Sequence, residues 1–203
     1  YKLKKFSKVK ILQNCEVLKA KNEKKFTIVN YRNTQTDKNY SVKSKYVIGC
    51  DGANSFIRDQ IKSPLEHLGF EQRWAVIDVI LKTNSNNLPD RTIQYCNANR
   101  PATYCRNVGK RRRWEIALKD HESYENFFDE KNLWEFLRQW VLPNEVTIER
   151  KTIYRFQSAI AKKWRKGRLF LVGDAAHLTP PFMGQGMCAG IRDASNLAWK
   201  ISI

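Results

Sequence analysis

The chain has 203 residues, of which 42% are hydrophobic and 12% aromatic, and it carries a formal net charge of +17 at pH 7. This length and composition predict a globular protein of one or two domains. A transmembrane helix is not predicted, because no run of about 18 apolar residues occurs.

The cysteines argue against two kinds of site. They are Cys15, Cys50, Cys96, Cys105 and Cys188. An odd number of widely spaced cysteines without a CxxC pair argues against a disulfide framework and a zinc site, and it favours a reducing compartment. We therefore expect a cytoplasmic protein without a metal centre.

The basic charge is spread along the chain, and many Lys residues stand beside Asn. Diffuse lysines without interleaved aromatic residues are typical of a solvated surface, so we expect no nucleic-acid partner. Attraction of an anionic substrate fits this charge better. A basic, non-catalytic module that binds nucleic acid or another anionic surface remains the alternative from a different functional class.

The first quarter of the chain predicts a β-meander. Strand patterns occupy residues 9–19, 25–31 and 40–49, with polar turns between them. The chain starts at Tyr1 without a signal-peptide pattern and ends in a helical pattern, so we interpret it as an internal fragment of a longer protein.

The meander leads into a short motif around an Asp-Gly pair. Residues 46–48 predict a buried strand, and Asp51 lies in the turn where this strand ends. Asn54 or Ser55 is a suitable N-cap for the helix that follows. Arg58 lies one helical turn beyond Asn54.

The middle of the chain predicts a sheet. A loop is expected at 64–69, followed by a strand at 73–82 with Ala75, Ile77, Val79 and Leu81 on one face. Further strands are predicted at 91–96, 102–108, 112–118 and 147–160, with a helix at 129–141.

Two features of this sheet concern charge. Asp78 lies on the opposite face of the strand, together with Trp74, Val76 and Ile80. This is an unusual place for a carboxylate, because these neighbours are apolar. We favour a paired structural carboxylate over a substrate-pocket group. Five arginines also cluster here, namely Arg100, Arg106, Arg111, Arg112 and Arg113. The forked guanidinium matches a carboxylate, so one of them is a candidate to hold an anionic substrate, although strand alternation does not say which.

The last third of the chain predicts a ligand-binding loop. The apolar run 169–172 is typical of a strand buried on both faces, and Asp174 lies where it ends. Ligands of open α/β sheets are met at such strand ends. Pro180 and Pro181 then predict a rigid extended segment.

Two glycines separate this segment from the last predicted helix. Gly184 and Gly186 leave the backbone bare, so that a flat ring could lie against it. A helix is predicted from Met187, and its unpaired amides and dipole favour negative charge.

This stretch resembles the second flavin motif of the flavoprotein aromatic hydroxylases, the group A monooxygenases. The residues that carry the resemblance are Gly173-Asp-Ala-Ala-His177, Pro180-Pro181 and Gly184-Gln-Gly186. The resemblance implies that Asp174 bonds the ribityl chain of FAD and that Pro181 and Gly184 lie near the reactive edge of the flavin. It also implies that Asp51, Gly52 and Arg58 form the family's Asp-Gly motif, which supports the FAD pyrophosphate and the pyridine nucleotide. For His177 we expect a packing and hydrogen-bonding role.

The cofactor-binding residues predicted in this way are Asp51, Gly52, Arg58, Gly173, Asp174, Pro181, Gly184, Gln185, Gly186, Met187 and Cys188. The predicted substrate residues are Tyr104, Arg106 and Arg113, since a Tyr could polarise a phenol and an Arg could hold an anion. Neither a catalytic side chain nor a metal ligand is assigned.

Within this family the chain looks most similar to the 3-(3-hydroxyphenyl)propionate and 3-hydroxycinnamate hydroxylases. The similarity implies a monooxygenase that uses FAD, NADH or NADPH, and O2 to hydroxylate a small aromatic acid ortho to its hydroxyl group. A ubiquinone-pathway or polyketide hydroxylase on the same scaffold is the nearest alternative.

The expected fold is α/β, with α+β character in this fragment and a p-hydroxybenzoate hydroxylase-like arrangement. Residues 1–62 and 166–203 are assigned to a partial, Rossmann-like FAD-binding domain that includes the β-meander. Residues 63–165 are assigned to a substrate domain on a mostly antiparallel sheet. The N-terminal unit with a GxGxxG turn is absent from the sequence.

Overall fold

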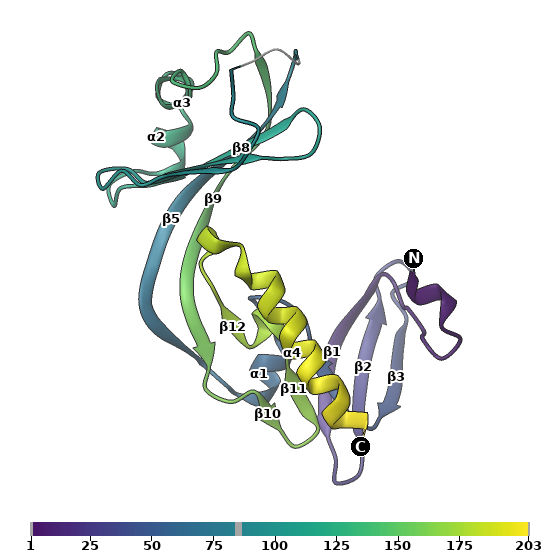
Figure 1. The fold of residues 1–203 in the computed structure, drawn as a ribbon. Coiled ribbons are helices and arrows are strands. Elements are labelled where there is room, and N and C mark those ends of the chain that lie inside the picture. Colours follow the sequence, from purple (N-terminus) through teal and green to yellow (C-terminus); the bar gives the residue numbers. More distant parts are fainter. Residues whose placement is uncertain (1, 84–86, 203) are drawn as a thin grey trace. The chain divides into compact units, whose positions relative to one another are not determined.

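The computed structural model describes residues 2–83 and 87–202 and divides into two compact units (Figure 1). Unit 1 comprises Tyr1–Leu68 and Ser158–Ile203, and unit 2 comprises Gly69–Gln157. The chain enters unit 2 through the long strand β5 (Leu65–Leu81) and leaves it through β9 (Val146–Ala161). Unit 1 is therefore discontinuous in sequence, and unit 2 is inserted into it.

Unit 1 begins with the short 3-10 helix η1 (Lys2–Lys5) and the predicted meander. Its strands are β1 (Cys15–Asn22), β2 (Thr27–Asn33) and β3 (Asn39–Ser44). They form an antiparallel sheet in the order β1-β2-β3. Residues 9–14 are not part of it, so the predicted first strand starts too early.

A second small sheet of unit 1 contains the parallel pair that carries the two motifs. Strand β4 (Val47–Gly49) pairs in parallel with β11 (Leu169–Leu171), and β10 (Arg165–Lys166) joins β11 in the antiparallel sense. Helix α1 (Phe56–Ile61) follows β4. After β11 come η2 (Gly173–Ala175), β12 (His177–Leu178), η3 (Pro181–Met183) and α4 (Gln185–Ser202).

Unit 2 is an antiparallel sheet covered by helices on one face. From β5 the order continues to β8 (Arg111–Ala117), β7 (Ala102–Arg106) and β6 (Ile93–Tyr95), while β9 is the other neighbour of β5. The helices are α2 (Tyr124–Phe128) and α3 (Glu130–Leu137). The mixed α/β fold with mostly antiparallel sheets is the one that the sequence predicted.

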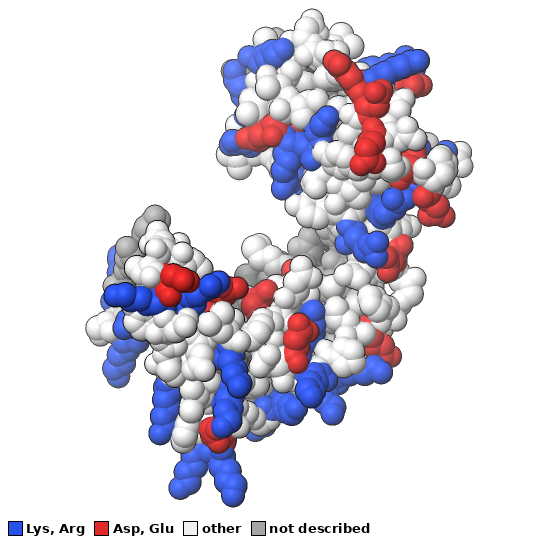
Figure 2. Space-filling view, turned by 180° about the vertical axis from the view of Figure 1, so that it is seen from behind, with Lys and Arg blue, Asp and Glu red and all other residues white. Residues whose placement is uncertain are grey.

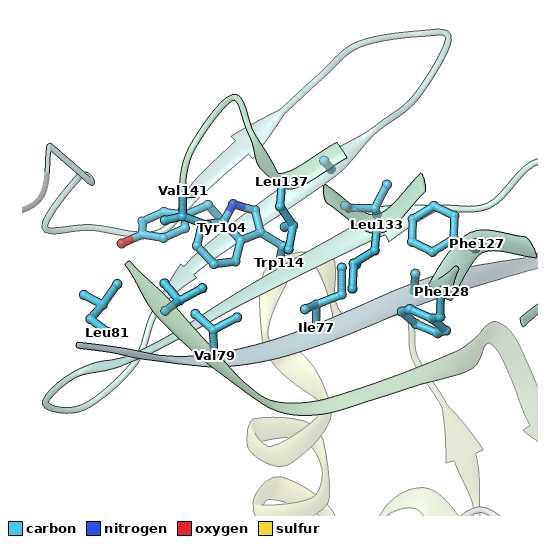
Figure 3. Close-up of a cluster of buried hydrophobic side chains, with 14 residues drawn as sticks. Ile77, Val79, Leu81, Tyr104, Trp114, Phe127, Phe128, Leu133, Leu137 and Val141 are labelled. Carbon is cyan, nitrogen blue, oxygen red and sulfur yellow. The ribbon is translucent and has the colours of Figure 1, made fainter. Parts of the chain in front are cut away.

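The core of unit 2 lies between this sheet and the helices (Figure 3). The predicted alternation is confirmed, because Ala75, Ile77, Val79 and Leu81 are all buried in this core. Trp114 of β8 is fully buried beside them and faces residues of α3 such as Leu137 (Figure 3). Aliphatic and aromatic side chains of this size each contribute about 1.5–3 kcal/mol when fully buried.

Two predictions for the middle of the chain are wrong. The expected loop at 64–69 is the first part of β5, a strand of 17 residues. The expected helix at 129–141 is shorter and is preceded by α2, because Asp129 ends α2 and at the same time caps α3 through the Lys131 amide.

The charged residues are interspersed. On the face that Figure 2 shows, Lys and Arg are spread over both units and Asp and Glu lie among them. Several of these charges are paired, for example Arg32 with Glu16 and Arg111 with Glu149. Among the described residues, no helix is long and apolar enough to cross a membrane.

Candidate functional site

Both predicted motifs follow strands of the parallel pair in unit 1. The register pairs Leu169 with Val47 and Leu171 with Gly49, so the two strands end at the same edge of their sheet. Asp51 follows β4 and Asp174 follows β11 within a few residues. This edge is where ligands of α/β sheets are met.

The Asp51 carboxylate organises the start of α1. Its Oδ1 accepts a hydrogen bond from the Ser55 hydroxyl at 2.6 Å, and its Oδ2 accepts one from the Ile57 amide at 3.0 Å. Ser55 is the N-cap and accepts from the Arg58 amide at 3.0 Å. Of the two caps that the sequence left open, Ser55 is therefore the right one.

The Arg58 side chain joins the two motifs. Its Nη2 donates to the Ala53 carbonyl at 2.7 Å and its Nη1 donates to the Ala175 carbonyl at 3.2 Å. The residue is only 9% exposed. Arg58 therefore braces the Asp-Gly motif, which includes Gly52, against the loop that carries Asp174.

Asp174 is presented differently. Gly173 begins the 3-10 turn η2 in the left-handed region (φ 63°), and the Ala176 amide closes this turn onto the Gly173 carbonyl at 2.7 Å. The Asp174 side chain is exposed, and within residues 2–83 and 87–202 its carboxylate has no hydrogen-bond or ion partner. A carboxylate held on a rigid turn in this way is available to accept hydrogen bonds from a ligand.

The predicted loop and helix follow. Pro181 is the first residue of η3, and Gly184 follows η3 in the left-handed region (φ 61°). No non-neighbouring atom of the described residues lies within 4 Å of where a Gly184 Cβ would be. Helix α4 starts at Gln185 and has no acidic residue in its first turn. Its first residues, Gln185, Gly186, Met187 and Cys188, are those that the sequence assigned to the cofactor.

The donor set suits a flavin. The exposed Asp174 can accept from ribityl hydroxyls, and the first amides of the long helix α4 can donate to a ring edge that becomes negative on reduction. The bare backbone at Gly184 leaves room for a flat ring. No group of three His, Cys, Asp or Glu side chains in the described part of the chain is arranged to hold a metal ion.

Helix α4 places few of its apolar side chains in a core. All of its residues are half-buried or exposed, and Met187 and Ile191 are 75% and 60% exposed. The helix predicted from Met187 is confirmed by α4. Met187 and Ile191, however, are not packed in a core of unit 1.

The three predicted substrate residues lie on two faces of the sheet in unit 2. Tyr104 and Arg106 share the helix-covered face, since Tyr104 pairs with Trp114 in the register. Arg113 lies on the opposite face, beside Asp78. The structure therefore does not bring these three side chains together in one pocket.

The side chains on the helix-covered face are already engaged. Tyr104 is fully buried and donates its hydroxyl to the Pro89 carbonyl at 3.0 Å, and burial raises its pKa. Arg106 pairs with Asp90 at 2.6 Å. These contacts support a structural role for Tyr104 and Arg106 within unit 2.

The opposite face carries a cluster of charges around Asp78. Arg113 Nε donates to Asp78 Oδ1 at 2.7 Å, and Arg150 Nε donates to Oδ2 at 2.9 Å. Burial works against ionisation of Asp78, but the hydrogen bonds and charges of the two arginines hold its pKa below the usual value. The prediction of a paired structural carboxylate is confirmed; Arg150, far along the sequence, was missed.

A second acidic group was also missed by the sequence analysis. Asp193 of α4 contacts both Gly173 and His177. His177 also stacks on Trp164 with 5.3 Å between ring centroids, so its packing and hydrogen-bonding role is as expected. No sequence pattern marked Asp193, because its partners lie in a loop well before the helix.

Comparison with known proteins finds relatives that are named hydroxylases. A probable NADH-specific resorcinol 4-hydroxylase of Rhodococcus jostii (strain RHA1) is 36% identical over 165 residues, which are 81% of this chain and 31% of that protein. A 3-(3-hydroxy-phenyl)propionate/3-hydroxycinnamic acid hydroxylase of Escherichia coli (strain SMS-3-5) is 30% identical over 203 residues, which are 99% of this chain and 36% of that protein. The chain thus spans about a third of the length of these relatives.

Solved structures share the fold. Aklavinone-11 hydroxylase, crystallised with FAD and aklavinone, superimposes with a TM-score of 0.81 at 20% identity, over 92% of this chain and 36% of that one. The flavin-dependent monooxygenase PieE, in complex with FAD and substrate, gives a TM-score of 0.76 at 23% identity, over 92% of this chain and 34% of that one.

The family model described as "FAD binding domain" matches residues 2–203 and so includes both motif loops and the whole of unit 2. Asp174 lies on its turn at the strand edge, and α4 begins directly after Gly184. The chain belongs to this FAD-binding domain family.

Proposed function

We propose that the full-length protein is a flavin-dependent monooxygenase that hydroxylates a small phenolic compound ortho to its hydroxyl group, with NADH or NADPH and O2. The observation that carries this proposal is the Asp174 turn and the α4 start at the edge of the β4–β11 pair. FAD, when bound there, supplies the redox and oxygen chemistry. The residues of this chain bind it, orient it and exclude water.

In this proposal unit 1 holds the cofactor. The Asp174 carboxylate accepts hydrogen bonds from the ribityl chain, Pro181 and Gly184 shape the loop beside the reactive edge, and the amides from Gly186 to Cys188 stabilise negative charge. The Asp-Gly motif supports the pyrophosphate through its backbone. Arg58 keeps the two loops in a fixed relation through its bonds to Ala53 and Ala175.

Unit 2 is proposed to bind the substrate, and Arg113 remains the candidate among the three predicted residues. It lies on the sheet face that the helices leave open, and Asp78 fixes its guanidinium from one side. The 3-hydroxyphenylpropionate of the relatives carries a carboxylate, which an Arg could pair with. A cytoplasmic location is part of the same proposal.

The names of the relatives support a phenolic substrate. Resorcinol and 3-hydroxyphenylpropionate both contain a phenol ring, and position 4 of resorcinol is adjacent to a hydroxyl-bearing carbon. A phenol hydroxyl donates electron density to its ortho position, which favours electrophilic oxygen transfer there. The name "NADH-specific" on one relative supports NADH as the reductant.

The test uses the purified full-length protein. We expect visible flavin absorbance, and NADH oxidation stimulated by resorcinol or by 3-hydroxyphenylpropionate, with a product that gains one oxygen from O2 at an ortho carbon. Asp174→Ala is expected to weaken FAD binding by about 1.5–3 kcal/mol. The matched control Asp120→Ala alters an exposed Asp of unit 2 and should bind FAD normally. A protein without flavin, or flavin binding unchanged in Asp174→Ala, would contradict the proposal.

A further inference from the structure

One carboxylate oxygen of α4 contacts both ends of the segment 173–177, which contains η2 and Asp174. We call this segment the Gly173–His177 turn. Asp193 Oδ2 accepts a hydrogen bond from the Gly173 amide at 3.0 Å and lies 2.7 Å from Nε2 of His177. Both side chains are largely shielded, with 19% of Asp193 and 14% of His177 exposed. Because an ionised carboxylate oxygen can only accept hydrogen bonds, the imidazole is expected to carry its N–H on Nε2 and donate to the same oxygen.

The helix lies close enough for this contact because two glycines face each other. A Cβ built on Gly190 would lie 3.4 Å from the Gly173 Cα, and one built on Gly173 would lie 3.6 Å from the Gly190 Cα. Asp193 is one turn beyond Gly190 on the same helix face. The close approach of helix and loop thus places the carboxylate at the first residue of the turn.

The other end of the turn is fixed from two further sides. His177 begins β12 and pairs with Ile160 of β9, and its ring stacks on Trp164 at an interplanar angle of 28°. Between the two ends lies Asp174, which is exposed and has no partner in the described part of the chain. The position of its carboxylate therefore depends on how firmly residues 173 and 177 are held.

We infer that Asp193 is a positioning residue for the flavin site: it couples α4 to the Gly173–His177 turn and so fixes the direction in which Asp174 points. The inference rests on the proposed FAD site, and Asp193 acts through Gly173 and His177 without contacting the cofactor. Since α4 also supplies the amides at its start, this contact sets the loop and the helix in one rigid arrangement.

The test compares substitutions that keep or remove the acceptor. In the full-length protein, Asp193→Ala removes both bonds and should raise the Kd for FAD roughly tenfold, the effect of losing about 1.4 kcal/mol. Asp193→Asn keeps an acceptor oxygen at the same place and should stay within about threefold of the wild type. His177→Phe keeps a ring for Trp164 but loses one of the two bonds, so its effect should be intermediate.

A second readout does not require the cofactor. Hydrogen–deuterium exchange of the FAD-free full-length protein should rise in peptides that contain residues 173–177 for Asp193→Ala, and not for Asp193→Asn. The control Asn196→Ala, an exposed position of the same helix, should change neither exchange nor affinity. If Asp193→Ala does not fold, the exchange and the FAD affinity of His177→Phe test whether the Asp193–His177 contact holds the turn.

The outcomes separate the two proposals. Faster exchange together with weaker FAD binding, rescued by Asn, supports the positioning role. Unchanged exchange, or faster exchange with an unchanged Kd for FAD, overturns it. If the wild-type protein does not bind FAD, the proposed function fails, and the exchange data alone then show whether Asp193 holds the turn.

Discussion

Arg58 donates a hydrogen bond to the carbonyl of Ala175, a residue 117 positions away in the sequence. The same guanidinium donates to the Ala53 carbonyl at 2.7 Å. One nearly buried side chain therefore connects the loop after β4 with the loop after β11. The two loops that are proposed to contact different parts of FAD cannot move apart without breaking these bonds.

The first prediction concerns this brace. Arg58→Met keeps the aliphatic stem but leaves the Ala53 and Ala175 carbonyls without their donor, which should cost about 1–3 kcal/mol. Urea unfolding of the full-length protein measures the loss, and we expect FAD affinity to fall as well. Arg155→Met is the matched control, because Arg155 is exposed and forms an ion pair with the exposed Glu71. Equal stability of the two variants would show that Arg58 is not a brace.

The second prediction concerns a carboxyl beside the Asp78 cluster. Glu115 is 12% exposed, and burial raises its pKa above the ordinary value of 4.5, although Arg113 acts in the opposite direction. A raised pKa means that the folded state binds the proton more tightly than the unfolded chain does. The charged carboxylate therefore destabilises the fold above its raised pKa. This penalty decreases as the pH falls through the raised pKa and is gone below about 4.5.

Glu115→Gln should consequently raise the free energy of unfolding at pH 7, by about 1 kcal/mol or less, with no gain at pH 4. Glu149 is the matched control, because its pKa is shifted in the opposite direction. The pKa of Glu149 is lowered by its hydrogen bonds with Arg111, so Glu149→Gln should not stabilise the protein at pH 7. Denaturant titrations at pH 7 and pH 4 decide this, and a destabilised Glu115→Gln at pH 7 contradicts the assignment.

Sequence patterns predicted the elements whose burial is regular. Two examples are the apolar run of β11 and the alternation of Ala75, Ile77, Val79 and Leu81. In both, the burial of the strand can be read from its own residues without knowledge of its neighbours. The start of β5 was missed because it lacks such a burial pattern. Residues 66–69 are exposed and follow Pro64, so only their place in a strand, and no burial pattern, gives them their conformation.

The site shows a similar division. Asp174 and the loop with Gly184 and Gly186 were found from their order along the chain. A strand is followed by an acidic residue, two prolines, two glycines and a helix. Asp193 and Arg150 were not found, because their partners lie 20 and 72 residues away. Such contacts depend on tertiary packing, which residue spacing alone does not encode.

The third prediction concerns the net charge of +17. On the face that Figure 2 shows, Asp and Glu residues lie among the Lys and Arg residues of both units. We expect the full-length protein not to bind a random-sequence DNA duplex at sub-micromolar Kd in physiological salt. Any binding at low salt should fall steeply as salt is added, because it depends on released counterions. Sub-micromolar binding at physiological salt would favour the nucleic-acid alternative.

The fourth prediction tests whether the start of α4 faces the flavin ring. Gly186 is the second residue of the helix, and a Cβ built on it would lie 3.4 Å from the Thr179 hydroxyl oxygen. Gly186→Val adds two methyl groups beyond that Cβ, and their crowding against Thr179 should shift the loop and so separate the ring from the helix amides. The amides and the dipole favour the anionic reduced flavin, so the variant should have a lower reduction potential and slower reduction by NADH.

The size of this shift follows from the helix effect, which is about 0.3–1 kcal/mol at exposed sites and up to about 2 kcal/mol when partly buried. A two-electron couple moves by about 30 mV per 1.4 kcal/mol, so the potential should fall by tens of millivolts at most. Dye-coupled titration of the FAD-loaded protein measures it. Ala194→Val places the same side chain on an exposed position of α4 and should leave the potential unchanged. An unchanged or raised potential in Gly186→Val would mean that the α4 amides do not face the flavin, and the Asp174 turn would then have to bind it without them.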